Sequence, residues 1–82
     1  MKVTIPGYTS LTGSPVAILQ AMQDARLFNH LDGDDYIKDV THAAWRFFGT
    51  ALQVTGDTYP ERCESLLREM DRTNMIHIEE EN

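Results

Sequence analysis

The sequence is short of three things that would assign it to a class at once: cysteine, long apolar runs and basic residues. With a single cysteine among 82 residues, no internal disulfide framework can form. No apolar run approaches the ~20 residues that a membrane-spanning helix needs. The start, Met1–Gly7, has one lysine and no apolar core, so we expect no secretory signal. These absences predict one cytoplasmic domain, residues 1–82, that has no membrane contact.

Basic side chains are too few for a nucleic-acid binder. Seven Lys and Arg stand against 13 Asp and Glu, and the formal net charge at pH 7 is −6. Proteins that bind DNA or RNA use Lys and Arg to displace counterions from phosphates. We therefore expect no direct nucleic-acid binding, and the acidic charge is explained most simply as a contribution to solubility.

Short strands are predicted where apolar and polar residues alternate. This occurs at Lys2–Ile5, Leu52–Thr55 and Ile76–Glu79. Tyr8–Gly13, rich in Thr, Ser and Gly, is predicted to be a loop. Residues 79–82 are an acidic tail that we expect to fray.

A first helix is predicted after this loop. Ser14 is a favourable N-cap and Pro15 suits the first helical position. We expect the helix to end near Asn29–His30. Its apolar stripe has helical spacing and consists of Ile18, Ala21, Met22 and Ala25, with Leu19 at the edge.

The second predicted helix begins after an acidic turn. Asp34 is the expected N-cap, and Gly49 is a favourable residue just beyond the C-terminus. Projected at ~100° per residue, the apolar residues cover an arc of about 140°, as expected of a helix that faces a core. These residues are Tyr36, Ile37, Val40, Ala43, Ala44, Phe47 and Phe48.

The third helix, from Thr58 to about Thr73, has the strongest local signals. Thr58 and Glu61 form a Thr-x-x-Glu capping box, with a proline in the first turn. Its outer face offers ion pairs between Glu64 and Arg68 and between Glu69 and Arg72. Its apolar stripe consists of Tyr59, Cys63, Leu66, Leu67 and Met70.

Together these elements, in the order β-α-α-β-α-β, predict an α+β domain of two layers. Three helices would pack on a short three-stranded sheet. The order of the strands stays open, and a parallel pair formed by the second and third strands would need a right-handed crossover. The alternative is a three-helix domain in which the two termini pair as a minimal sheet.

No residue pattern points to catalysis, a cofactor or a metal. The loop Gly7–Ser14 precedes a helix, as phosphate-binding loops do, but it lacks the Walker spacing and lysine. The acids that follow Asp32 lack the glycine and glutamate of a calcium loop. Cys63 lies in an apolar stripe, which favours packing over reactivity. His30, His42 and His77 have no metal-ligand spacing.

One face of the second helix departs from the acidic background. Lys38, His42 and Arg46 follow one another at four-residue intervals, opposite the apolar arc, and Trp45 lies just beyond the edge of that arc. Trp and Arg together are typical of interaction anchors. Alternatively, neighbouring Asp35 and Asp39 form ion pairs with the basic residues, and Trp45 covers a strand or loop.

The sequence therefore favours a small non-enzymatic domain for protein interaction or regulation, which binds another protein or a second copy of itself. Its candidate partner surface is Lys38, His42, Trp45 and Arg46. Two other hypotheses remain. The acidic surface would imitate nucleic acid and inhibit a DNA- or RNA-handling protein, or the Gly7–Ser14 loop would bind a phosphate or nucleotide weakly.

Overall fold

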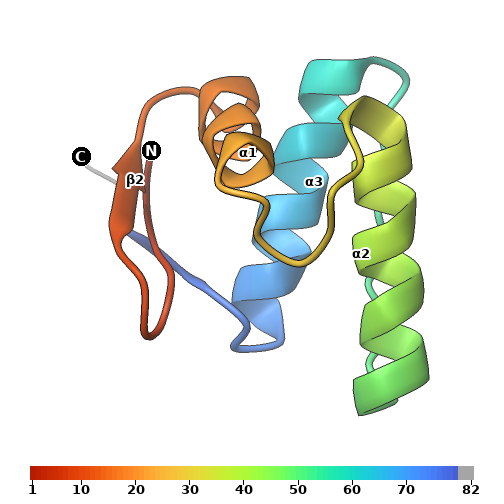
Figure 1. Ribbon diagram of the computed structural model, residues 1–82. Coiled ribbons are helices and arrows are strands. Elements are labelled where there is room, and N and C mark those ends of the chain that lie inside the picture. Colours follow the sequence, from red (N-terminus) through yellow and green to blue (C-terminus); the bar gives the residue numbers. More distant parts are fainter. Residues whose placement is uncertain (80–82) are drawn as a thin grey trace.

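The fold is α+β, as predicted, with three helices and a three-stranded sheet. The computed structural model describes residues 1–79, so residues 80–82 of the predicted acidic tail lie outside the described part. In Figure 1 the sheet lies at one side, α1 and α3 lie next to it, and α2 lies on the far side of α3. The elements in chain order are β1 (Lys2–Thr4), β2 (Ser10–Thr12), α1 (Pro15–Asp24), α2 (Gly33–Phe48), α3 (Tyr59–Arg72) and β3 (His77–Glu79).

The sheet is antiparallel throughout, with β1 between β2 and β3. Val3 lies opposite Leu11 on one side and Ile78 on the other, so one apolar row crosses the sheet. Val3 is fully buried beneath the helices. The bounds of β1 and β3, the first and last strands, agree with the sequence prediction to within one residue. Because both pairings are antiparallel, the fold needs no parallel crossover.

The second strand is not where the alternating pattern placed it. Ser10–Thr12, within the segment predicted as a loop, forms β2, and the order of elements is therefore β-β-α-α-α-β. The turn that makes this hairpin is held by hydrogen bonds from the Tyr8 N–H to the Ile5 carbonyl (3.0 Å) and from the Ile5 N–H to the Thr9 carbonyl (2.9 Å). Since Leu11 is the one apolar residue of β2, the sequence offers no alternation to reveal it.

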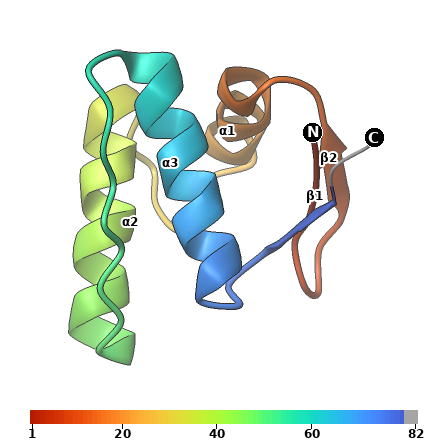
Figure 2. The same cartoon turned by 180° about the vertical axis from the view of Figure 1, so that it is seen from behind.

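Residues 50–57, which we call the return segment, contain the predicted strand Leu52–Thr55 but are irregular. Figure 2 shows this segment running back along α2 to the start of α3. Leu52 is buried, whereas the Gln53 N–H donates to Glu69 Oε1 (2.8 Å) and the Thr55 N–H donates to Ser65 Oγ (2.9 Å). The alternation of burial is thus real, but the backbone N–H groups of the segment donate to side chains of α3 instead of to a neighbouring strand.

The first helix is shorter than predicted. It ends at Asp24, and Ala25, which we expected in its apolar stripe, is exposed. The chain then leaves the helical path through two residues with positive φ, Arg26 (55°) and Phe28 (75°). The buried face is formed by Ile18, Leu19, Met22 and Gln23. A helix continued to residue 30 would not leave the chain free to turn back toward α2.

The start of α2 differs by two residues from the prediction, and its end agrees. Asp32, not Asp34, is the N-cap residue, and its side chain makes no capping hydrogen bond. Asp34 is instead paired with Arg62 of α3. Gly49 follows the helix with a left-handed φ of 64°, where a side chain would be strained.

The third helix is built as its sequence predicts. Thr58 is the N-cap, with its Oγ1 accepting from the Glu61 N–H (3.4 Å) and its hydroxyl donating to the Glu61 carboxylate (2.9 Å). Gly56 (φ 137°) passes so close that a Cβ there would lie 2.7 Å from that of Glu61. The predicted stripe is confirmed for Cys63, Leu66, Leu67 and Met70, which have no exposed surface, while Tyr59 is partly buried and packs against the core.

The apolar arc of α2 is buried only over its first three turns. Tyr36, Ile37, Val40 and Ala44 belong to the core, but Phe47 and Phe48 are 70% and 74% exposed. Their assignment to the core was therefore wrong. Both views show α2 ending beyond the end of α3, so its last turn has no neighbouring helix to pack against.

Replacing Thr58 with alanine removes the N-cap of α3. We expect Thr58→Ala to lower the free energy of unfolding by about 1 kcal/mol, because an N–H of the first turn loses its acceptor. Urea denaturation of both proteins measures this difference. An unchanged midpoint would show that the cap contributes nothing to stability.

Replacing Met70 with alanine leaves a cavity beneath the sheet and helices. Because Met70 is fully buried, Met70→Ala should cost about 2–5 kcal/mol of unfolding free energy. Glu64→Ala, on the exposed face of the same helix, serves as the control and should cost no more than about 0.5 kcal/mol. Equal effects of the two substitutions would contradict the assigned core.

Candidate functional site

A groove of about 770 Å³ runs between α2 and the return segment, and we call it the α2 groove. Lys38, His42 and Trp45, on successive turns of α2, line one side of it. Leu52 and Val54 of the return segment line the other. The groove exists because the return segment is held against α3 by the Gln53 and Thr55 hydrogen bonds, which leaves its apolar side chains facing α2.

The structure brings together three of the four residues of the predicted partner surface. Lys38, His42 and Trp45 line the α2 groove, whereas Arg46 does not. The Arg46 guanidinium instead lies over the Phe47 ring, 5.5 Å from its centroid. Trp45 is 62% exposed, so it covers neither a strand nor a loop fully. It forms an exposed aromatic wall of the groove.

The predicted ion pairs between the acidic residues of α2 and this basic face do not form. Among residues 1–79, neither Asp35 nor Asp39 lies within ion-pair distance of Lys38, His42 or Arg46. The predicted pairs on α3 do form, with 3.2 Å between Arg68 and Glu64 and 3.0 Å between Arg72 and Glu69. Thus Glu64 and Glu69 of α3 are engaged in ion pairs, whereas Lys38 forms no ion pair within residues 1–79.

One end of the α2 groove is closed by a bidentate ion pair. Arg62 Nε lies 2.7 Å from Asp34 Oδ1, and Arg62 Nη2 lies 3.0 Å from Asp34 Oδ2. The hydrogen bonds from Arg62 hold the pKa of Asp34 below its usual value, and Asp34 in turn raises the pKa of Arg62. Both side chains are therefore charged and mutually neutralised at pH 7. Lys38 is the net positive charge of the groove.

Sequence reasoning missed the apolar half of this site. Leu52 and Val54 were assigned to a strand, and Asp34 to a helix cap, so neither was associated with Trp45. The alternation at Leu52–Thr55 shows that Leu52 and Val54 share a face but not what that face lies against, so the sequence carries no signal that places them beside Trp45.

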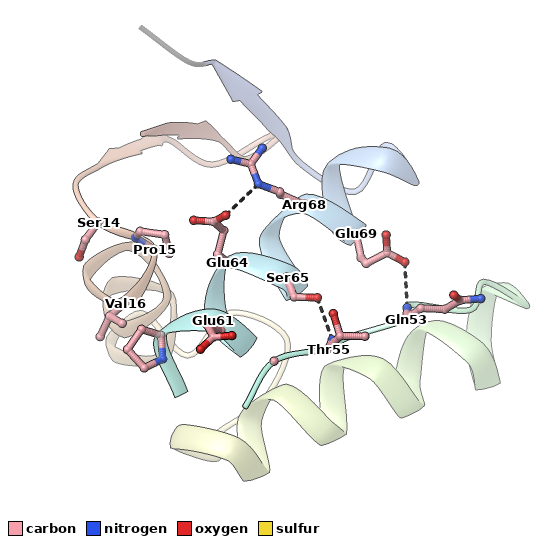
Figure 3. Close-up of a pocket in the computed structure, with 12 residues that line it drawn as sticks. Ser14, Pro15, Val16, Gln53, Thr55, Glu61, Glu64, Ser65, Arg68 and Glu69 are labelled. Carbon is pink, nitrogen blue, oxygen red and sulfur yellow. Dashed lines mark hydrogen bonds and ion pairs between the residues drawn. The ribbon is translucent and has the colours of Figure 1, made fainter. Parts of the chain in front are cut away.

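A second recess, of about 630 Å³, lies beside Ser14, the last residue of the loop proposed to bind phosphate. Figure 3 shows Glu61, Glu64 and Glu69 around it, together with Arg68. The Ser14 hydroxyl already accepts from the Ala17 N–H (3.1 Å), and the Gly13 N–H donates to the Met1 carbonyl (3.0 Å). With three carboxylates around it and few free donors, this recess is unfavourable for an anion.

Cys63 and Tyr36, two further residues of reactive type, are buried in the core. Burial raises the pKa of the Cys63 thiol, which opposes formation of the thiolate nucleophile. Burial also raises the pKa of Tyr36, whose hydroxyl donates to the Leu27 carbonyl (2.7 Å). Within residues 1–79, no group of His, Cys, Asp and Glu side chains has the arrangement of a metal site. No helix there is long and apolar enough to span a membrane.

Comparison with known protein families, with curated proteins and with solved structures found no match to this chain.

The Asp34–Arg62 pair predicts a pH dependence of stability. Because the native pKa of Asp34 lies below the unfolded value of 3.8, its contribution is complete well above that value and is lost as the pH falls through the native pKa. We expect Asp34→Asn to be less stable than the native chain at pH 7 and to lose less stability on acidification to pH ~3. Urea denaturation over this pH range measures both effects.

The matched control is Asp35→Asn. Asp35 occupies the same first turn of α2 and makes no ion pair within the described residues. Its substitution should leave the acid-induced loss of stability as in the native chain. Parallel pH profiles of all three proteins would show that the Asp34–Arg62 pair does not stabilise the fold.

Proposed function

We propose that this chain is a non-enzymatic protein-interaction domain that binds its partner in the α2 groove. The observation that supports the proposal is Trp45, 62% exposed on a helix whose other face is buried, with Leu52 and Val54 across the groove. Exposing an indole beside apolar side chains costs free energy unless a partner covers them. Trp is also the residue type most often found at the energetic centre of interfaces.

The titratable groups support binding rather than catalysis. General acids and bases in active sites have pKa values moved toward neutrality by burial or by like charges. Asp34 and Glu69 are instead paired with arginines, which lower their carboxyl pKa values, and the pKa of Cys63 is raised. None of these three shifts prepares a group for proton transfer or nucleophilic attack at pH 7.

The groove favours a partner segment of defined chemistry. An apolar side chain would lie between Trp45 and the Leu52–Val54 wall, and a carboxylate would pair with Lys38 and with His42 when it is protonated. Arg62 contributes less, since Asp34 already neutralises it. An amphipathic helix with acidic residues beside its apolar face meets both requirements. The buried Cys63 thiol agrees with action in the reducing cytoplasm, where we expect the protein to work.

The test is the double substitution Trp45→Ala with Arg46→Glu. We expect it to remove partner binding while the fold persists, because loss of an aromatic anchor at an interface costs ~2 kcal/mol or more and both side chains are exposed. Quantitative pull-down from the native host measures binding, and circular dichroism checks that the variant is folded. Trp45 is the one tryptophan of the chain, so a blue shift of its fluorescence reports occupation of the groove directly.

The matched control is Tyr8→Ala with Arg68→Glu, which alters an exposed aromatic and an exposed arginine away from the groove. It should retain every partner of the native chain. If the Trp45 variant unfolds, the side chain is structural. If that variant stays folded and keeps its partners, the binding surface is not the α2 groove.

A further inference from the structure

The end of the molecule at which α2 and α3 both stop is apolar, and we call it the aromatic pole: Phe28, Phe47, Phe48 and Met75. Phe28 is 51% exposed, and Phe47 and Phe48 are 70% and 74% exposed. A recess of about 400 Å³ lies among Phe28, Phe48 and Met75, with Thr50 and Thr73 completing its wall. Phe47 does not line this recess, but it precedes Phe48 in α2, and one face of its exposed ring carries the Arg46 guanidinium.

The acidic first turns of α2 and α3 lie at the opposite end of the molecule, and the charge beside this pole is basic, since the Arg46 guanidinium lies over the Phe47 ring. No side chain that lines the recess is charged. In Figure 1, α2 and α3 both begin at the top and both end at the bottom. The first turns at the top carry Asp34, Asp35 and Glu61, whereas the last turns at the bottom carry Arg46 and Arg72.

The two carboxylates near the end of α3 are already engaged. Glu69 pairs with Arg72, and Asp71 accepts from the Ile78 N–H (3.1 Å). A second acidic molecule therefore meets little repulsion at the pole.

From this geometry we propose that the aromatic pole is the interface of a symmetric homodimer, in which each protomer inserts Phe47 against the recess of its partner. A two-fold interface brings the same patch of both subunits together, so the patch must be complementary to itself. An exposed ring adjacent in sequence to the lining of an uncharged recess meets this requirement. The proposal goes beyond the α2 groove and does not depend on it, because Lys38, His42 and Trp45 line the groove and none of them lines the recess.

The exposed apolar area is about half of what one partner buries in a standard interface, which suits a weak contact with a second copy of the chain. An aromatic side chain offers roughly 150–250 Å², so the three exposed phenylalanines present on the order of 400 Å² of apolar surface. Standard interfaces bury about 800 Å² per partner, with a polar rim around an apolar centre. Thr50 and Thr73, which line the recess with Phe28 and Phe48, would form that rim. The area is that of a reversible dimer whose population rises with concentration.

Electrostatics predicts how this dimer responds to salt. Each protomer carries a formal charge of −6, so the two acidic ends repel each other at low ionic strength. An interface held by apolar contact keeps its attraction when salt is added, while the repulsion is screened. We therefore expect dimerisation to strengthen as sodium chloride increases. A dimer held by ion pairs would weaken instead.

The experiment is analytical ultracentrifugation of the full chain over a wide concentration range and at several salt concentrations. The native chain should show a monomer–dimer equilibrium, and Phe47→Ala with Phe48→Ala should raise the dimer dissociation constant by about 30-fold or more. Met75→Glu, which places a carboxylate at the recess, should have a similar effect. Tyr8→Ala removes an exposed aromatic from the β1–β2 turn and should leave the dimer intact.

Circular dichroism confirms that each variant is folded, and isotope-filtered NMR on a mixed sample tests the geometry through contacts between the Phe47 ring and the Met75 methyl of the other protomer. A native chain that stays monomeric at every concentration and salt condition would overturn the proposal. So would a dimer that persists in the Phe47/Phe48 variant. A dimer lost on Trp45→Ala alone but kept in the Phe47/Phe48 variant would assign self-association to the α2 groove, which overturns the pole and leaves the proposed binding groove in place.

Discussion

Burial of one face of α3 is the constraint on which the rest of this structure depends. Cys63, Leu66, Leu67 and Met70 are fully buried, and α3 packs against α1, α2 and β3. A chain of this length can form only one hydrophobic core, so every other element must bury its apolar side chains on or near this helix. The close approach of Gly56 and the Thr58 cap fix where that helix begins, and thereby where the core lies.

Polar contacts then set how the helices lie around this core. The Gln23 side chain, buried in α1, accepts from the Gly33 N–H at the start of α2 (3.0 Å) and donates to the Tyr59 hydroxyl of α3 (3.1 Å). Buried amides without partners are costly, so this arrangement favours one relative placement of the three helices. The Asp34–Arg62 pair adds a second link between α2 and α3. Together these contacts position Trp45 opposite Leu52 and Val54.

The surface that results has three chemically different regions. Acidic first turns lie at one end, a groove with an exposed indole and one unneutralised lysine follows α2, and an aromatic end lies where the helices stop. A length difference produces the last feature, since α2 continues beyond α3 and its apolar face goes with it. The proposed dimer interface is thus a consequence of how far α2 extends beyond α3, whereas the proposed binding groove depends on the hydrogen bonds between the return segment and α3.

Local signals in the sequence determined α3, the end of α2, the first and last strands of the chain and the α+β class, because caps, turn residues and periodicity act over a few neighbouring residues. Of the candidate site, they identified Lys38, His42 and Trp45 through helical spacing alone. Only the tertiary structure decided that Leu52–Thr55 binds α3 side chains instead of a strand, that Ser10–Thr12 pairs with β1, and that Phe47 and Phe48 are exposed. Alternation shows that one side of a segment is buried but not what hydrogen-bonds the other. Likewise, a helical arc shows which face is apolar but not how far the neighbouring helix extends along it.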